Sequence, residues 1–155
     1  MNVPRVRVSR RLPGSLDRVT VFSGAGGELS ADTLAPGTAS TLRELARGPG
    51  WSGRLGQRFE RLSADGTVVE LAGLGPLPEL ADAQLRAEIA ASVERAGRAG
   101  ARRLGIVLPP LGAADAPLAE RTARAAALAE YRFERFRKPP ANAERVEEIL
   151  LVPAD

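Results

Sequence analysis

The chain has 155 residues, a length that suits one domain with a single buried core. Hydrophobic residues make up 44% of the chain but aromatic residues only 4%, so we expect an aliphatic core and few aromatic faces on which single-stranded nucleic acid could stack. The chain has no cysteine and no histidine, which excludes disulfides, thiol catalysis and the commonest general base and metal ligand.

The charge is less basic than the sequence pI of 10.4 suggests, because the formal net charge is only +3. Nearly all the basic residues are arginine, so almost nothing titrates between the carboxylates and arginine. Two clusters could contact phosphate: Arg5, Arg7, Arg10, Arg11 and Arg18, and then Arg132, Arg135, Arg137 and Lys138. We favour solvent-facing or partner-facing roles for both clusters, because neither carries a nucleic-acid-binding motif.

The sequence also predicts the localisation of the protein. No apolar stretch approaches the roughly 18 residues that a membrane span needs. The segment Met1–Arg11 lacks the apolar region of a signal peptide. We therefore expect a soluble, cytoplasmic protein that makes no contact with membrane.

The first third of the chain is predicted to hold two strands, a loop and a helix. Valines predict a short strand over Val3–Val8, and Leu16–Phe22 predicts a second. Residues 23–37 are rich in turn formers and are expected to be a loop. A short helix is expected to begin near Thr38 or Thr41, where Thr41 and Glu44 have capping-box spacing, and to end before the glycine at position 48.

The middle of the chain predicts a hairpin and a long helix. The runs Arg58–Leu62 and Thr67–Ala72 flank an Asp-Gly pair, which is typical of a hairpin turn. Asp82 is a candidate N-cap for the helix that follows, and Gly97 or Gly100 can end it. Its apolar stripe, expected to face the sheet, is Leu85, Ile89, Val93 and Ala96.

The remaining third adds two strands around a second long helix. The apolar run Leu104–Leu108 predicts a central strand covered on both faces. An alanine-rich helix is expected over 116–137, ended by Pro139-Pro140, and Ile149–Val152 predicts the last strand. The expected fold class is therefore α/β, with a mixed β-sheet packed between helices.

Candidate sites for chemistry are few. The acidic residues Glu28, Asp32, Asp65, Asp82 and Asp115 lie singly where turns and caps use the same residue types, so we expect no metal site. The glycine-rich turns Ser23–Gly27 and Gly73–Pro76 could cradle phosphate, but neither fits a G-x-G-x-x-G or Walker pattern, and we interpret both as tight turns. Trp51 is either an anchor for a partner domain or, as we favour, a lid on the core.

Several segments, taken in order, resemble the N-terminal domain of the leucine aminopeptidase, or cytosol aminopeptidase, family. They are GPGWSGRLGQ at 48–57, VVELAGLG at 68–75, the helix and strand that follow, ERTARAAALAEYRFERFRKPP at 120–140, and VEEILLV at 146–152. The most specific is Tyr131–Arg137, which is similar to the family's Y-x-F-x-x-Y-K. Here Phe136 stands in place of the usual tyrosine and Arg137 in place of the usual lysine.

The resemblance implies a macro-domain-like fold and a non-catalytic role. In this family a catalytic domain follows, and it holds two divalent metals, zinc or manganese, by residues that include an N-T-D-A-E-G-R motif. No such string occurs here, so no catalytic, cofactor-binding or metal-binding residue is carried over. We expect residues 1–155 to be one accessory domain, cut from a longer homo-oligomeric aminopeptidase, a hexamer by analogy, whose catalytic domain acts on peptides.

Two alternatives from another class of function stay open. Macro-like domains suggest binding of ADP-ribose or another phosphate ligand at Gly24–Gly27 or Gly73–Gly75. The arginine clusters suggest contact with DNA, which some relatives have adopted. Neither alternative makes the chain an enzyme.

Overall fold

The structure is a computed structural model, and it describes residues 4–26, 29, 31–109 and 146–152. Its six strands are β1 (Arg5–Val8), β2 (Arg18–Ser23), β3 (Arg58–Leu62), β4 (Val68–Gly73), β5 (Arg103–Val107) and β6 (Glu148–Val152). Its helices are α1 (Pro36–Ala46), α2 (Asp82–Arg98) and the short 3-10 helix η1 (Leu77–Glu79). The predicted helix at 116–137 lies outside the described residues.

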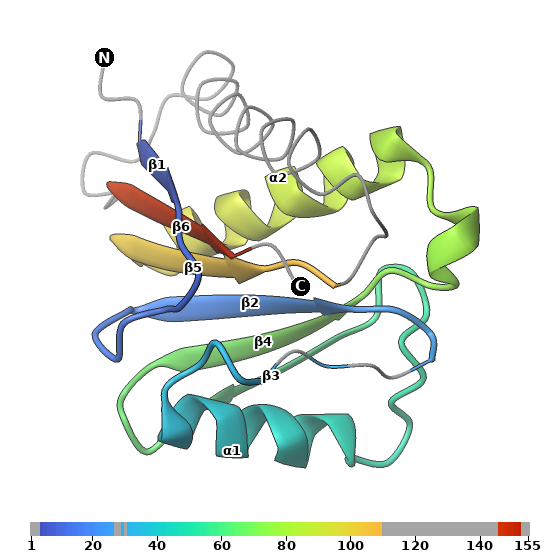
Figure 1. The fold of residues 1–155 in the computed structure, drawn as a ribbon, viewed down its shortest axis with the longest axis horizontal. Helices are drawn as coiled ribbons and strands as arrows, with labels where there is room; N and C mark the ends of the chain where they lie inside the picture. Colours follow the sequence, from blue (N-terminus) through green and yellow to red (C-terminus); the bar gives the residue numbers. More distant parts are fainter. Residues whose placement is uncertain (1–3, 27–28, 30, 110–145, 153–155) are drawn as a thin grey trace.

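The strands form one mixed sheet in the order β1-β6-β5-β2-β4-β3. Every neighbouring pair is parallel except β3 and β4, which form the predicted antiparallel hairpin. Figure 1 shows the sheet between α1 and α2, which confirms the expected α/β class. Strand β5 lies in the interior of the sheet, as its apolar sequence predicts.

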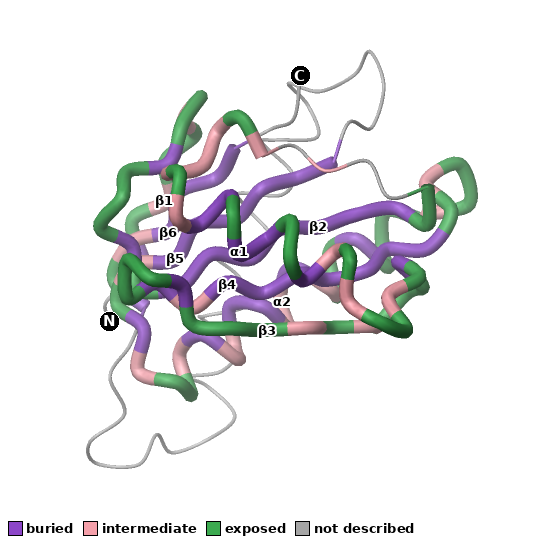
Figure 2. The backbone as a smooth tube through the Cα atoms, turned by 90° about the horizontal axis from the view of Figure 1, so that it is seen from below, coloured by how far each residue is buried: buried purple, intermediate pink, exposed green. Residues whose placement is uncertain are grey.

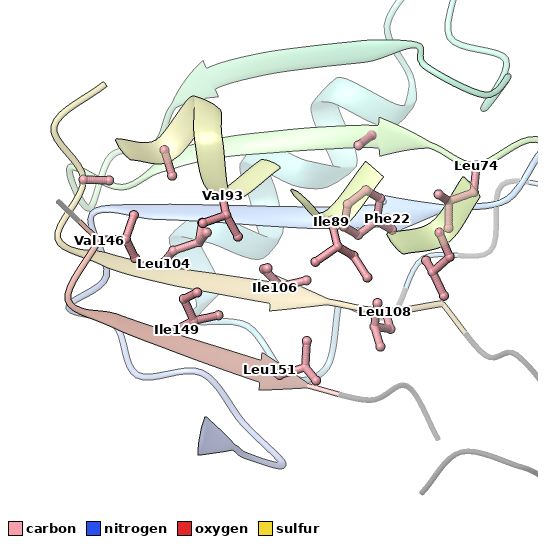
Figure 3. Close-up of a cluster of buried hydrophobic side chains, with 14 residues drawn as sticks. Phe22, Leu74, Ile89, Val93, Leu104, Ile106, Leu108, Val146, Ile149 and Leu151 are labelled. Atoms are coloured by element: carbon pink, nitrogen blue, oxygen red, sulfur yellow. The ribbon is translucent and has the colours of Figure 1, made fainter. Parts of the chain in front are cut away.

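Two hydrophobic cores occupy the two faces of the sheet. On one face, the predicted stripe of α2 is buried against β2, β5 and β6 (Figure 3). The members contributed by α2 are Leu85, Ile89, Val93 and Ala96. On the other face, Leu42 and Leu45 of α1 pack on valines and leucines of β2 and β4. Along the interior strands the apolar side chains therefore alternate between the two cores, as the period-2 geometry of strands dictates.

The segment between β1 and β2 completes the second core. It crosses the α1 face of the sheet, where Leu12 and Leu16 are buried. A Cβ at Gly105 would lie 2.8 Å from a methyl carbon of each of these leucines. Glycine in the middle of β5 therefore lets this segment approach the sheet closely.

Helix α1 begins earlier than expected, at Pro36 instead of Thr38 or Thr41. Proline suits the first turn because its missing N–H has no intrahelical acceptor there. The capping interpretation of Thr41 was wrong: Thr41 lies inside the helix, and its hydroxyl donates to the carbonyl oxygen of Gly37 at 3.1 Å. Helix α2 also starts one residue away from expectation, because Ala81 is its N-cap and Asp82 its first residue.

No helix among the described residues is long and apolar enough to cross a membrane.

Candidate functional site

Three glycine-containing loops meet at the carboxyl ends of β2 and β4, where parallel sheets usually bind ligands. Backbone hydrogen bonds join them. The amide of Leu74 donates to the carbonyl of Ser23 at 2.9 Å, and the amide of Ala25 donates to the carbonyl of Gly75 at 2.9 Å. The amide of Gly75 in turn donates to the carbonyl of Gly53 at 2.8 Å.

The glycines permit this contact between backbones. Gly75 and Gly53 have φ of +72° and +70°, the left-handed region that favours glycine. A Cβ at Gly53 would lie 2.6 Å from the carbonyl oxygen of Gly24, and one at Gly73 would overlap the backbone of the 48–57 loop. Gly53 and Gly73 therefore allow the close approach of the loops, whereas Gly75, with its positive φ, serves a tight turn. The amides of Ala25, Leu74 and Gly75 are already bonded within the protein.

Gln57 fixes the 48–57 loop from within. Its Oε1 accepts from the amides of Ser52 at 2.9 Å and Gly53 at 3.0 Å, and its Nε2 donates to the carbonyl of Gly50 at 2.6 Å. Trp51 beside it is partly buried against the α1-face core, with its ring edge-on to Phe59 at a centroid distance of 5.2 Å. The tryptophan is thus a lid on the core, as we favoured.

A buried ionic cluster lies between α2 and the sheet, and sequence reasoning missed it. At its centre is Glu70 of β4, whose side chain is 2% exposed. Its Oε1 accepts from Arg95 of α2 at 2.7 Å, and its Oε2 accepts from Arg18 of β2 at 2.7 Å. Arg18 also donates to Glu60 of β3 at 2.6 Å, and Glu60 is the solvent-exposed member of the cluster.

Two hydroxyls extend the cluster into the core. Ser92 of α2 donates to Thr20 Oγ1 at 2.7 Å, and Thr20 donates to Glu70 Oε1 at 3.3 Å. Arg18, Thr20 and Glu70 all come from neighbouring strands and point to the face that α2 covers. The cluster therefore ties α2 to three strands by polar contacts, alongside the apolar stripe.

The surroundings keep both central groups ionised. Burial disfavours the charge of Glu70, but hydrogen bonds from Arg95 and the charges of Arg95 and Arg18 outweigh it, so the pKa of Glu70 lies below its ordinary value. Burial likewise disfavours the charge of Arg18, but Glu60 and Glu70 outweigh it and hold its pKa above the usual value. Both oxygens of the Glu70 carboxylate accept hydrogen bonds from guanidinium groups, so its charge is balanced within the protein.

The cluster corrects one expectation. Arg18 was grouped with the solvent-facing or partner-facing arginines, but it is only 5% exposed. The physical reason is its register: it opens β2, an interior strand, and reaches Glu70 on the neighbouring strand. The signal for the cluster was Glu70, a charge in the otherwise apolar run VVELAG.

The remaining candidates stay apart. Asp32, Asp65 and Asp82 are separate, and the part of the chain that the structure describes contains no group of three acidic residues that could hold a metal ion. Asp65 lies against the first turn of α1, where its carboxylate approaches Gly37. Glu28 and Asp115, the second arginine cluster and the Tyr131–Arg137 motif lie outside the described residues.

Comparison with known proteins identifies the family. A family model described as "Cytosol aminopeptidase family, N-terminal domain" matches residues 19–140. A search of curated proteins gave no match.

Solved structures share the fold. A mutant of tomato leucine aminopeptidase aligns over 96% of this chain with a TM-score of 0.70 and 14% identity. The bottromycin maturation enzyme BotP, in complex with Mn and in a second structure, aligns over 88% of this chain with 31% identity and TM-scores of 0.54 and 0.53.

The chain spans 32% of the tomato enzyme and 26% and 27% of the BotP chains. The family-model match covers most of the sequence, and the structural alignment shows that the chain shares its fold with part of the tomato enzyme. The chain therefore belongs to the cytosol aminopeptidase family, in which it corresponds to the N-terminal domain.

Proposed function

We propose that this chain is the accessory, non-catalytic N-terminal domain of an aminopeptidase that removes N-terminal amino acids from peptides. The observation that carries the proposal is the family match over residues 19–140. Among the described residues, polar groups bond within the protein, which supports the proposal: arginines occupy both oxygens of the buried Glu70 carboxylate, and the glycine loops bond to one another. In this proposal the domain contributes a stable folded unit to the full protein.

The family's metals do not fit the residues described here, since these contain no suitable group of ligands. In the proposed protein a second domain holds two divalent metals, zinc or manganese. BotP, which was solved in complex with Mn, supports this assignment. The metals' role would be to polarise the scissile carbonyl and activate water.

The proposed partners are the catalytic domain of the same protein and further subunits of a homo-oligomer, a hexamer by analogy with the family. Peptides would bind to the catalytic domain. We place the assembly in the cytoplasm, consistent with a chain without cysteines.

An activity assay tests the non-catalytic role. The purified chain, incubated with a leucine anilide in manganese buffer, should release no product above the buffer rate, while tomato leucine aminopeptidase serves as the positive control. Hydrolysis that follows the chain through successive purification steps would contradict the proposal.

The coding sequence tests the link to a parent enzyme. Downstream of Asp155 we expect a segment with the lysine, aspartates and glutamates of a two-metal site. A stop codon directly after Asp155 would contradict it.

Calorimetric titration with ADP-ribose tests the alternative of phosphate binding. We expect no heat of binding, because the amides of Ala25, Leu74 and Gly75 already donate to carbonyl groups of the protein.

A further inference from the structure

Among the residues that the structure describes, β3 pairs only with β4, so its outer edge is unpaired. Figure 2 looks at the molecule from the side of this edge and shows β3 running across the view with most of its residues exposed. Leu62, at its end, is 64% exposed, and Leu55, in the loop before it, is 40% exposed. Two of the three large exposed hydrophobic residues in the described part of the chain therefore lie along this edge.

The pairing with β4 fixes which backbone groups of β3 point outward. The amide of Gly73 donates to Gln57, and the amide of Ser63 donates to Thr67. In an antiparallel pair, hydrogen-bonded residues alternate with non-bonded ones, so the backbone N–H and C=O groups of residues 57, 59, 61 and 63 face β4. The N–H and C=O groups of Arg58, Glu60 and Leu62 consequently face away from the sheet.

The side chains along this edge are complementary to themselves. We propose that β3 pairs antiparallel with β3 of a second copy of this chain, with Arg58 opposite Glu60 of the second copy and Phe59 opposite Phe59 at the two-fold axis. Arg58 is exposed, with no ion pair to any described residue. Glu60 is 59% exposed; its Oε2 binds Arg18, and its Oε1 bonds to no described residue.

This register avoids the clash of like charges that its nearest neighbours create. The nearest alternatives that keep the outward groups paired place Arg58 opposite Arg58, Glu60 opposite Glu60, or Arg61 opposite Arg61. The chosen register instead forms two Arg58–Glu60 pairs and four backbone hydrogen bonds. It also brings Leu62 beside the loop that carries Leu55 of the second copy.

The interface rests on the fold and not on peptidase activity, so its failure and that of the proposed function are separate results. Glu60 holds Arg18 in place, so the charge test uses Arg58. By sedimentation at submillimolar concentration, the chain should dimerise, and Arg58→Glu should weaken the dimer about tenfold or more, since two attractive pairs become repulsive. Arg86→Glu, the same change on exposed α2 surface, should leave it unchanged.

Cysteine cross-linking tests the register, because the chain has no cysteine of its own. Phe59→Cys should form a disulfide-linked dimer on mild oxidation, since facing residues of a non-bonded antiparallel pair have Cα atoms about 4.5 Å apart. Arg61→Cys is the matched control: in this register its two copies lie about 13 Å apart and should not link.

Three results would overturn the proposal. The first is a chain that stays monomeric at submillimolar concentration, and the second is an Arg58→Glu variant that dimerises as tightly as the parent. The third is a disulfide-linked dimer of Arg61→Cys when a folded Phe59→Cys variant forms none. Circular dichroism establishes that each variant is folded; if Phe59→Cys does not fold, the charge series decides.

Discussion

Glu70 shows how one buried charge can stabilise a fold through its ion pairs. Replacing it by glutamine would leave Arg18 and Arg95 charged, with a neutral partner between them. Removing one member of a buried pair costs about 3–5 kcal/mol. We expect Glu70→Gln to lower the free energy of unfolding by that order at pH 7, as measured by urea denaturation.

The pH dependence of this effect follows from the lowered pKa of Glu70. A carboxyl group whose pKa is depressed by folding stabilises the folded state above its unfolded pKa, and that contribution is lost as the pH falls through the folded pKa. The difference in free energy of unfolding between Glu70→Gln and the parent should therefore be largest at neutral pH. It should shrink below pH 4.5, the ordinary pKa of this group.

Glu44→Gln provides the control for this experiment. Glu44 also binds an arginine, Arg61, at 2.8 Å, but both side chains are more than half exposed. Exposed pairs contribute about 0–1 kcal/mol. If Glu44→Gln lowered the free energy of unfolding as much as Glu70→Gln does, burial of the Glu70 cluster would not be the cause of the effect at Glu70.

At the scale of elements, α1 takes its N-terminal stabilisation from another element. Its N-cap, Ala35, offers no side-chain hydrogen bond, and its first turn contains no acidic residue. The carboxylate of Asp65, in the β3–β4 turn, lies against Gly37 in that first turn. An anion there is favoured by the helix dipole, so the hairpin turn stabilises the helix.

A double-mutant cycle tests this contact. Gly37→Ala adds a Cβ where the Asp65 carboxylate lies, so its gain in helix propensity should be offset by displacement of Asp65. In an Asp65→Ala background, Gly37→Ala should instead stabilise the protein by about 0.5–1 kcal/mol, the usual advantage of alanine over glycine in a helix. Additive effects in thermal denaturation would contradict the contact.

At the scale of the molecule, the sheet order predicts a gradient of protection. Strand β5 has neighbours on both sides, whereas β3 and β1 are edges. Hydrogen exchange should be slowest for β5 and β2, and fast for the outward amides of Arg58 and Glu60 in dilute solution. If the β3 edges pair, those two amides should become protected as the concentration rises. Uniform exchange across the sheet would contradict the topology.

Much of this architecture could be predicted from the sequence. Periodicity indicated α2 and its buried stripe, and Asp65-Gly66 indicated the hairpin, because both are local patterns. The predicted start of α1 was wrong because Thr41 and Glu44 have the spacing of a capping box, whereas the helix begins at Pro36. The Glu70 cluster depends on strand order, which places Arg18, 52 residues away in sequence, on the neighbouring strand. No local pattern contains that information.

The bonded glycine loops have one more consequence, which concerns how this domain can change over time. Where β2 and β4 end, the contacts are made by backbone atoms, and Gly53 and Gly73 are needed because they have no side chain. Almost any substitution at these two glycines adds bulk and must move a loop, so we expect the corner to accept few mutations. Invariance at these glycines across relatives would then record a geometric requirement, and a scan that equates invariance with ligand binding would misassign it.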